Sequence, residues 1–195
     1  MSANPRIGAI VLAAGFSSRF GGTKLRARLN SGYTVLQQTV ATVQSIIPQV
    51  LLVTRPDSGV TITDSSVYIE AFSDAEKGMG ASLAFGMRQA LQHFDWDGCL
   101  VCLGDMPFIR PETYLALAEA LGADNIVLPD YGGTTGNPVG FGRVFFTALT
   151  GLHGDQGGRD VIRDNSDAVV RITVNDPAIS QDIDTPDDLI RYDQT

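Results

Sequence analysis

Apolar residues occur along this chain in two repeating patterns. Short runs that are apolar at nearly every position, such as IVLA and LVCL, are typical of strands buried on both faces of a sheet. Longer stretches with apolar residues every three or four positions are typical of helices packed on one side. The short runs predict strands at residues 7–13, 49–54, 66–71, 98–103, 125–129, 138–141 and 168–174. The longer stretches predict helices at residues 34–47, 80–94, 111–121, 143–149 and 158–164.

The order of these elements predicts the fold class. Strands alternate with helices and several strands are apolar throughout, which predicts an α/β protein with three layers, a mainly parallel sheet covered by helices on both faces. The chain contains no low-complexity tract, repeat or obvious linker, so we expect residues 1–195 to form a single domain. In such sheets, ligands bind beyond the carboxyl ends of the strands.

Composition and charge exclude several functional classes. The apolar runs are shorter than the roughly 20 residues needed to cross a bilayer. The first run predicts a strand rather than a signal peptide, so we expect a cytoplasmic protein without a membrane partner. The net charge of −8 argues against nucleic acid as a partner. Residues 1–56, however, carry a charge of +6 and no acidic residue. This segment is suited to a polyanion, with chance clustering of surface arginines as the alternative.

Two cysteines are spaced as C-x-x-C in the stretch GCLVCL. This spacing occurs in metal and redox sites, but side chains three positions apart on a strand point to opposite faces. We therefore expect Cys99 and Cys102 to be buried core residues. His93 and His153 have no partner at ligand spacing, so we expect them to be structural or exposed.

The stretch VLAAGFSSRFGGTKL, residues 11–25, leads a strand into a loop of glycines, hydroxyls and two cations. Its spacing matches neither a dinucleotide fingerprint nor a Walker A loop. Backbone N–H groups in such loops form concavities that bind anions, and Arg19 and Lys24 supply charge for phosphate oxygens. The alternative is a solvated turn with two surface cations.

Two further stretches place carboxylates where a metal could bind. LVCLGDMP ends a buried strand with Asp105, at the sheet edge where Mg²⁺ would meet phosphates. In DIDTPDDL, the residue types at 185, 186 and 188 are those preferred at the start of a helix: Thr185 at the N-cap, Pro186 at the first position and Asp188 at the third. Asp182 and Asp184 have no such explanation and share one face if the chain is extended. A carboxylate from this segment near Asp105 would complete a divalent-metal site.

Three glycine-rich stretches carry weaker signals. KGMGASLAFGM places Ser82 in the first turn of a helix, and helix N-termini attract anions. TTGNPVGF contains Asn137 and Pro138, and GDQGGRD contains Arg159. Each stretch also has an ordinary interpretation as a turn or a local cap.

Taken in this order, these stretches resemble the MobA-like nucleotidyltransferases, and the likeness is greatest to the molybdenum cofactor cytidylyltransferases. It extends from about residue 7 to residue 191. The resemblance implies a Rossmann-like nucleotidyltransferase that uses Mg²⁺ to transfer a nucleoside monophosphate from CTP, or another NTP, to a molybdopterin-type acceptor. A molybdoenzyme apoprotein is a further implied partner. Guanylyl-transferring relatives tend to read L-A-G-G at the opening loop, so Leu12-Ala13-Ala14-Gly15 favours CTP.

The resemblance also implies roles for individual residues. Arg19, Lys24 and Asp105 would be catalytic, and Asp105 and Asp184 would hold the metal. The implied nucleotide-binding residues are Leu12, Ala13, Ala14, Gly15, Ser17, Ser18, Arg19, Lys24, Ser82 and Asp105. The implied acceptor-binding residues are Asn137, Pro138 and Arg159.

Other functions fit parts of the same pattern. Asp182-Ile183-Asp184 matches the D-x-D motif of sugar-nucleotide glycosyltransferases, although it lies near the C-terminal end rather than mid-chain. A related nucleotidyltransferase that uses a sugar phosphate or a methylerythritol phosphate is a second alternative. A non-catalytic carrier of molybdenum cofactor is a third.

Overall fold

A central sheet organises the chain in the computed structural model, which describes residues 5–16, 20 and 23–193. The strands are β1 (Ile7–Ala13), β2 (Val50–Thr54), β3 (Tyr68–Ala71), β4 (Gly98–Leu103), β5 (Ile126–Tyr131), β6 (Thr134–Thr135), β7 (Val139–Gly142) and β8 (Val169–Thr173). The α-helices are α1 (Val35–Ile46), α2 (Met79–His93), α3 (Pro111–Ala120), α4 (Phe146–Thr150), α5 (Arg159–Asp164) and α6 (Pro186–Tyr192).

The eight strands are ordered β3-β2-β1-β4-β7-β5-β6, and β8 also pairs with β5. The pairs β1–β2, β1–β4 and β2–β3 are parallel, and β8 is parallel to β5. Strands β6 and β7 are antiparallel to the strands that they pair with. The predicted α/β class and mainly parallel sheet are confirmed.

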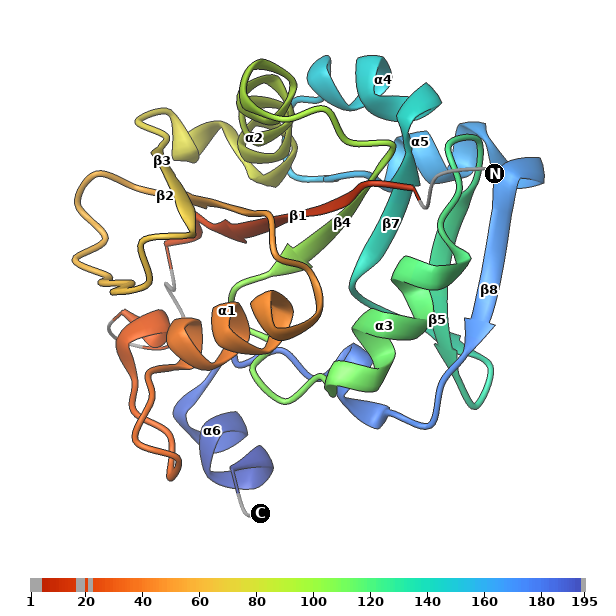
Figure 1. Ribbon diagram of the computed structural model, residues 1–195. Helices are drawn as coiled ribbons and strands as arrows, with labels where there is room; N and C mark the ends of the chain where they lie inside the picture. Colours follow the sequence, from red (N-terminus) through yellow and green to blue (C-terminus); the bar gives the residue numbers. More distant parts are fainter. Residues whose placement is uncertain (1–4, 17–19, 21–22, 194–195) are drawn as a thin grey trace.

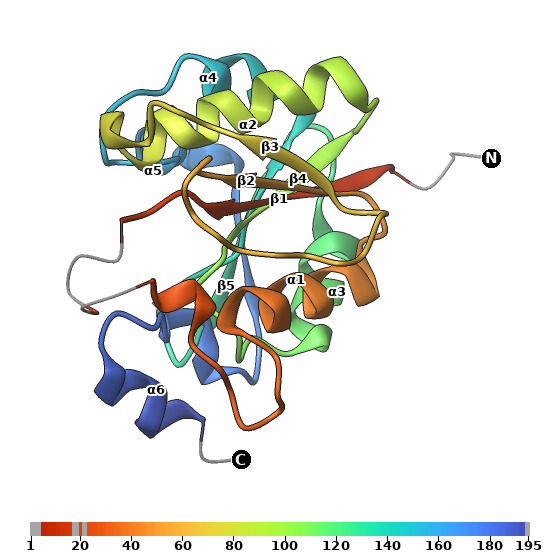
Figure 2. The same cartoon turned by 90° about the vertical axis from the view of Figure 1, so that its left-hand side faces the viewer.

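Helices cover both faces of this sheet, which makes three layers (Figure 1). Figure 2, turned by 90°, shows α2, α4 and α5 on one side of the strands and α1 and α3 on the other, with α6 beyond α1. Each face has its own apolar cluster, because the central strands send alternate side chains to opposite sides. Among the described residues, no helix has the length and apolar character needed to span a bilayer.

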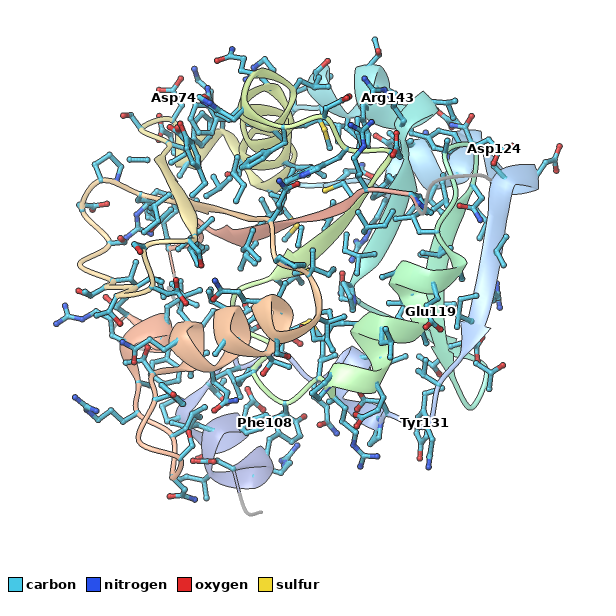
Figure 3. All side chains as sticks on the ribbon, in the orientation of Figure 1. Asp74, Phe108, Glu119, Asp124, Tyr131 and Arg143 are labelled. Carbon is cyan, nitrogen blue, oxygen red and sulfur yellow. The ribbon has the colours of Figure 1, made fainter. Side chains whose placement is uncertain are left out.

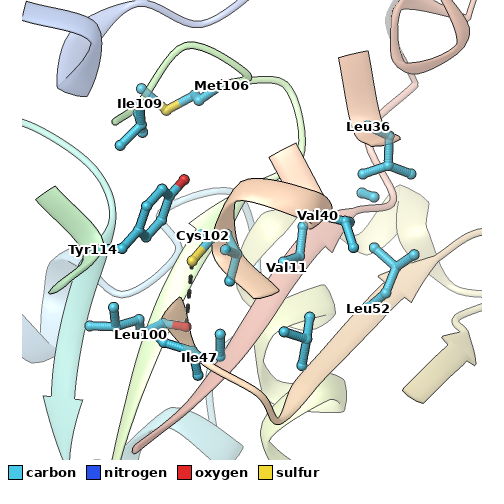
Figure 4. Packing of buried hydrophobic residues seen from close by; sticks show 14 of the residues in the cluster. Val11, Leu36, Val40, Ile47, Leu52, Leu100, Cys102, Met106, Ile109 and Tyr114 are labelled. Carbon is cyan, nitrogen blue, oxygen red and sulfur yellow. Dashed lines mark hydrogen bonds between the residues drawn. The ribbon is translucent and has the colours of Figure 1, made fainter. Parts of the chain in front are cut away.

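The two cysteines illustrate this alternation. Cys102 lies in the cluster beneath α1 and α3, near Leu100 and Tyr114 (Figure 4), whereas Cys99 lies in the cluster beneath α2. Cys99 is 0% and Cys102 1% exposed, and burial raises the pKa of both thiols. The expectation that they are core residues is confirmed.

Most predicted element boundaries are confirmed within about two residues, and the exceptions have local causes. Strand β6 was not predicted, because its two threonines are exposed and carry no apolar alternation. The strand exists because Gly132 and Gly133, with φ of 60° and 88°, turn β5 back on itself. The helix predicted over residues 143–149 begins as a 3₁₀ turn, Arg143–Phe145, before α4.

Candidate functional site

Strands β1 and β4 lie side by side and end at the same edge of the sheet. Leu12 is in register with Leu103, and the N–H of Gly104 donates to the Leu12 carbonyl at 2.9 Å. A Cβ on Gly104 would lie 3.0 Å from a Leu36 methyl, so the backbone here approaches α1 closely. The Thr39 hydroxyl donates to the Gly104 carbonyl at 3.1 Å. These contacts hold the following residue, Asp105, at the carboxyl edge.

The C-terminal segment reaches the same edge through one backbone hydrogen bond. The N–H of Ile183 donates to the Asp105 carbonyl at 3.0 Å, and the Ile183 side chain is 0% exposed. Because side chains alternate along an extended chain, a buried Ile183 directs its neighbours Asp182 and Asp184 toward the cleft. All three carboxylates, from Asp105, Asp182 and Asp184, have ligand oxygens within 4.8 Å of one another.

Helix α6 anchors this segment after it passes the cleft. Thr185 and Asp188 form a capping box, in which the Asp188 carboxylate accepts the N–H of Thr185 at 2.8 Å. The expectation that Thr185 caps a helix is therefore confirmed. The ring of Phe108, labelled in Figure 3, lies 6.5 Å from that of Tyr192 on α6. The carboxylate of Asp193 accepts the N–H of Asn30 at 2.7 Å.

Lys24 lies between the carboxylates. Its Nζ atom is 2.7 Å from Asp105 Oδ2 and 2.7 Å from Asp184 Oδ1, and the Lys24 side chain is only 11% exposed. The three carboxylates and this ammonium have a combined formal charge of −2. Hard oxygen ligands with this residual charge suit a divalent cation such as Mg²⁺, so the residues present fit the metal that the sequence predicts.

The local environment changes the pKa of both central groups. Burial raises the pKa of the Asp105 carboxyl, and the nearby Asp182 carboxylate adds to this, although Lys24 opposes it. Burial alone would lower the pKa of Lys24, but its contacts with Asp105 and Asp184 outweigh burial and raise it. Lys24 is therefore charged at neutral pH, while Asp105 binds a proton more readily than an ordinary aspartate.

Three adjoining cavities follow this edge of the sheet, and all three are lined by Leu12, Met79 and Leu103. The central cavity, of about 530 Å³, contains Lys24 and the carboxylates of Asp105, Asp182 and Asp184. A second, of about 280 Å³, extends toward the N-terminus of α2. The third, of about 410 Å³, has mainly apolar walls and lies toward β7 and α5.

The structure brings most of the predicted site residues to these cavities. The central one is lined by Leu12, Ala13, Gly15, Lys24, Asp105, Arg159 and Asp184, the second by Leu12, Ala14, Gly15, Ser82 and Asp105, and the third by Leu12, Asn137 and Arg159. Pro138 is buried and is not among the residues lining the third cavity. Ser17, Ser18 and Arg19 lie outside the described residues.

Several residues of the site were not among those predicted to bind, and Asp182 and Met79 are two of them. Asp182 is the third member of the carboxylate cluster, and its spacing of two residues from Asp184 was the signal for it. Met79 lines all three cavities and is 45% exposed. A single methionine at the first position of a helix carries no distinctive pattern, so the sequence held no signal for it.

The glycine-rich stretches meet beside this edge. Gly80 donates its N–H to the Gly154 carbonyl at 2.7 Å, and a Cβ on Gly80 would lie 2.7 Å from the His153 carbonyl oxygen. A Cβ on Gly78, whose φ is 99°, would lie 2.4 Å from Asp155 Oδ1. Glycine is therefore required by close packing between the start of α2 and the loop before α5, which brings Ser82 and Arg159 to adjoining cavities.

Residues 9–169 match the family described as the MobA-like NTP transferase domain. The chain belongs to this family. It is therefore a nucleotidyltransferase, and the resemblance drawn from its motifs is confirmed.

Relatives of this MobA-like chain carry several functional names. Purine catabolism protein PucB of Bacillus subtilis (strain 168) is 27% identical, over 96% of this chain and 97% of its own. A probable molybdenum cofactor guanylyltransferase of Aquifex aeolicus (strain VF5) is 29% identical, but over 56% of this chain and 51% of its own. The names of these relatives therefore differ on the biological role.

Solved structures match over the full length. The crystal structure of Rv0371c from Mycobacterium tuberculosis H37Rv has a TM-score of 0.86 and 28% identity, and covers 100% of both chains. A structure of Rv0371c in complex with manganese has a TM-score of 0.77 and 25% identity, covering 97% of this chain and 100% of that one. A similar protein thus binds a divalent metal.

Proposed function

We propose that this MobA-like protein transfers CMP from CTP to a terminal phosphate of molybdopterin and releases pyrophosphate. The observation that carries the proposal is the convergence of Lys24, Asp105 and Asp184, from widely separated parts of the chain, on one cavity at the carboxyl edge. A cation between carboxylates, beside a cleft of about 530 Å³, suits a metal-bound triphosphate.

The proposed reaction needs positioning and charge stabilisation rather than a protein nucleophile. An oxygen of the acceptor phosphate attacks the α-phosphorus of the nucleotide, and the bond from that phosphorus to the bridging oxygen of the β-phosphate breaks. Asp105 and Asp184, with Asp182 beside them, would hold Mg²⁺, which supplies neutralisation of the triphosphate. Lys24, and by resemblance Arg19, would stabilise the charge that develops on the leaving pyrophosphate.

The flanking cavities suit the two organic substrates. We assign the base to the cavity lined by Ala14, Gly15 and Ser82, whose wall contains backbone groups and one hydroxyl. We assign the pterin to the cavity of about 410 Å³, whose apolar walls include Val101 and Phe141 and suit a flat ring. Arg159 lines both this cavity and the central one, so it is placed to meet the acceptor phosphate.

GTP is the second candidate nucleotide. Relatives from Aquifex aeolicus and other bacteria are named probable molybdenum cofactor guanylyltransferases, whereas the Leu12-Ala13-Ala14-Gly15 sequence favours CTP by resemblance. We further propose that residues 1–195 act as one domain in the cytoplasm and that the product passes to a molybdoenzyme apoprotein.

The experiment supplies each of the four NTPs in turn with Mg²⁺ and molybdenum cofactor and measures pyrophosphate. Release with CTP alone is the expected result. Release with GTP alone would overturn the base assignment and keep the reaction class. A carrier would retain the cofactor without consuming any NTP, and a glycosyltransferase would release a nucleoside diphosphate from a sugar nucleotide. Replacing the cofactor by sugar phosphates or methylerythritol phosphate tests the acceptor.

A further inference from the structure

Arg55 connects the end of β2 to the beginning of the loop that follows β1. It is the first residue after β2, so it lies at the same carboxyl edge as the site. Its Nη1 donates to the Gly15 carbonyl at 2.7 Å, and its guanidinium carbon lies 4.3 Å from the centroid of the Phe16 ring. Its Nε donates to Asp57 Oδ1 at 2.9 Å. One side chain therefore holds two consecutive residues of the loop.

The Arg55 side chain is less exposed than that of an ordinary surface arginine and contacts three residues. The side chain is only 15% exposed. Its guanidinium donates hydrogen bonds through Nη1 and Nε, and the face of the guanidinium lies over the Phe16 ring. The Asp57 carboxylate accepts a hydrogen bond from Nε of the guanidinium, and this hydrogen bond lowers the pKa of Asp57. The guanidinium is thus pre-oriented toward Gly15 and Phe16.

The two residues that Arg55 holds belong to the site, whereas Arg55 does not line its cavities. Gly15 and Phe16 both line the central cavity and the one toward α2. Phe16 is 55% exposed, so burial of its own apolar surface does little to fix it. A Cβ on Gly15 would meet no atom within 4 Å, so local packing does not constrain that residue either.

We infer that Arg55 is a positioning residue for nucleotide binding, which acts by holding Gly15 and Phe16 against the cleft. The inference rests on the proposed function for its kinetic consequence, because the held residues line the cavities assigned to the nucleotide. It adds a role for a residue after β2, in a part of the chain where no site residue was predicted.

The test compares Arg55→Ala and Arg55→Lys with a matched control, Arg171→Ala. Arg171 lies on β8, is 65% exposed and lines none of the three cavities. Loss of a charge-assisted hydrogen bond and a cation–π contact should raise the KM for the NTP about tenfold in Arg55→Ala. The kcat and the KM for the acceptor should change by less than about threefold, because the reacting groups stay in place. Arg55→Lys, which keeps the charge, should recover part of the NTP affinity.

A second readout does not depend on turnover. Hydrogen exchange of the peptide covering residues 10–25 should be faster in Arg55→Ala than in the wild type, and unchanged in Arg171→Ala. Unchanged exchange in Arg55→Ala would overturn the inference, as would equal increases in the KM for nucleotide and acceptor together with a lower Tm. If the wild type releases no pyrophosphate from any NTP, the proposed function fails while the exchange measurement still decides the role of Arg55.

Discussion

Replacing Lys24 by methionine should make the nucleotide-free protein bind divalent metal more tightly. The substitution removes the ammonium that lies 2.7 Å from both Asp105 and Asp184, and changes the formal charge of the cluster from −2 to −3. In the wild type, Lys24 occupies a position between carboxylates that a cation would also prefer. A bound metal and the ammonium would therefore compete for the same negative charge.

The size of the effect follows from Coulomb's law. Two unit charges about 4 Å apart interact by about 1 kcal/mol in water and roughly 4 kcal/mol at an effective permittivity of 20. The Asp184 side chain is 36% exposed, so solvent reaches the cluster and the lower figure applies. A divalent ion doubles that figure to about 2 kcal/mol. Lys24→Met should then bind Mg²⁺ or Mn²⁺ roughly 10- to 30-fold more tightly than the wild type.

The same variant should bind NTP more weakly and turn it over at least about 100-fold more slowly, since loss of one preorganised donor typically costs this much. Calorimetric titration with Mn²⁺ after EDTA treatment measures the first effect, and pyrophosphate release measures the second. Arg171→Met is the control, because it removes one positive charge from an exposed residue outside the cavities.

Stability provides a third observable for Lys24→Met. Removing the ammonium deletes the ion pair of the partly buried Asp105 and leaves its carboxylate close to that of Asp184, so in EDTA the variant should lose about 2 kcal/mol of unfolding free energy. Added Mg²⁺ should restore much of the loss, since a ligand that binds only the folded state stabilises it. The reasoning is refuted if Lys24→Met binds metal no more tightly than the wild type, or if its stability in EDTA is unchanged.

Other perturbations test the remaining parts of the structure. Asp105→Asn should lose turnover with Mg²⁺ while its circular dichroism spectrum stays native, and an active variant would show that the metal assignment is wrong. Because burial raises the pKa of Asp105 above 3.8, kcat/KM at limiting Mg²⁺ should fall with decreasing pH through an apparent pKa above that value, and an acid limb at or below 3.8 would contradict this. Asp176→Ala leaves the Thr113 hydroxyl and two backbone N–H groups without their buried acceptor, so urea denaturation should show a loss of about 3 kcal/mol; an unchanged midpoint would speak against it. Since burial raises the pKa of Cys99 and Cys102, neither thiol should react with a thiol reagent until the protein unfolds, and stoichiometric labelling of the native protein would count against their burial.

The layers of the fold could be predicted because strands buried on both faces consist almost entirely of apolar residues. Strands β1, β2 and β4 lie between helical layers on both sides, and almost every residue in them is buried. Strands β3 and β8 are largely exposed, yet their β-branched residues still indicated strands. Strand β6 depends instead on a glycine turn and on pairing with β5, and tertiary pairing of two polar residues leaves no periodic pattern.

Site residues could be predicted from the sequence where a local sequence rule identifies them. They could not be predicted where a contact between distant parts of the chain places them in the site. Asp105 follows a buried strand directly, and Asp184 became a candidate because helix capping accounts for its neighbour Thr185 but not for it. The ion pair between Lys24 and Asp184 joins positions 160 residues apart, so no spacing could indicate it. Arg55 left no signal, because an arginine after a strand usually serves only as a surface cation.

The distribution of charge along the chain explains why this site exists only in the folded protein. Residues 1–56 contain no acidic residue, so the carboxylates that surround Lys24 must come from later segments. They come from Asp105, at the end of a central strand, and from the segment around Ile183, which docks on Asp105 through a single backbone hydrogen bond. A cation bound by Asp105 and Asp184 would bridge the central sheet and the C-terminal segment. Metal binding and docking of that segment would therefore be coupled, since each would stabilise the arrangement that the other requires.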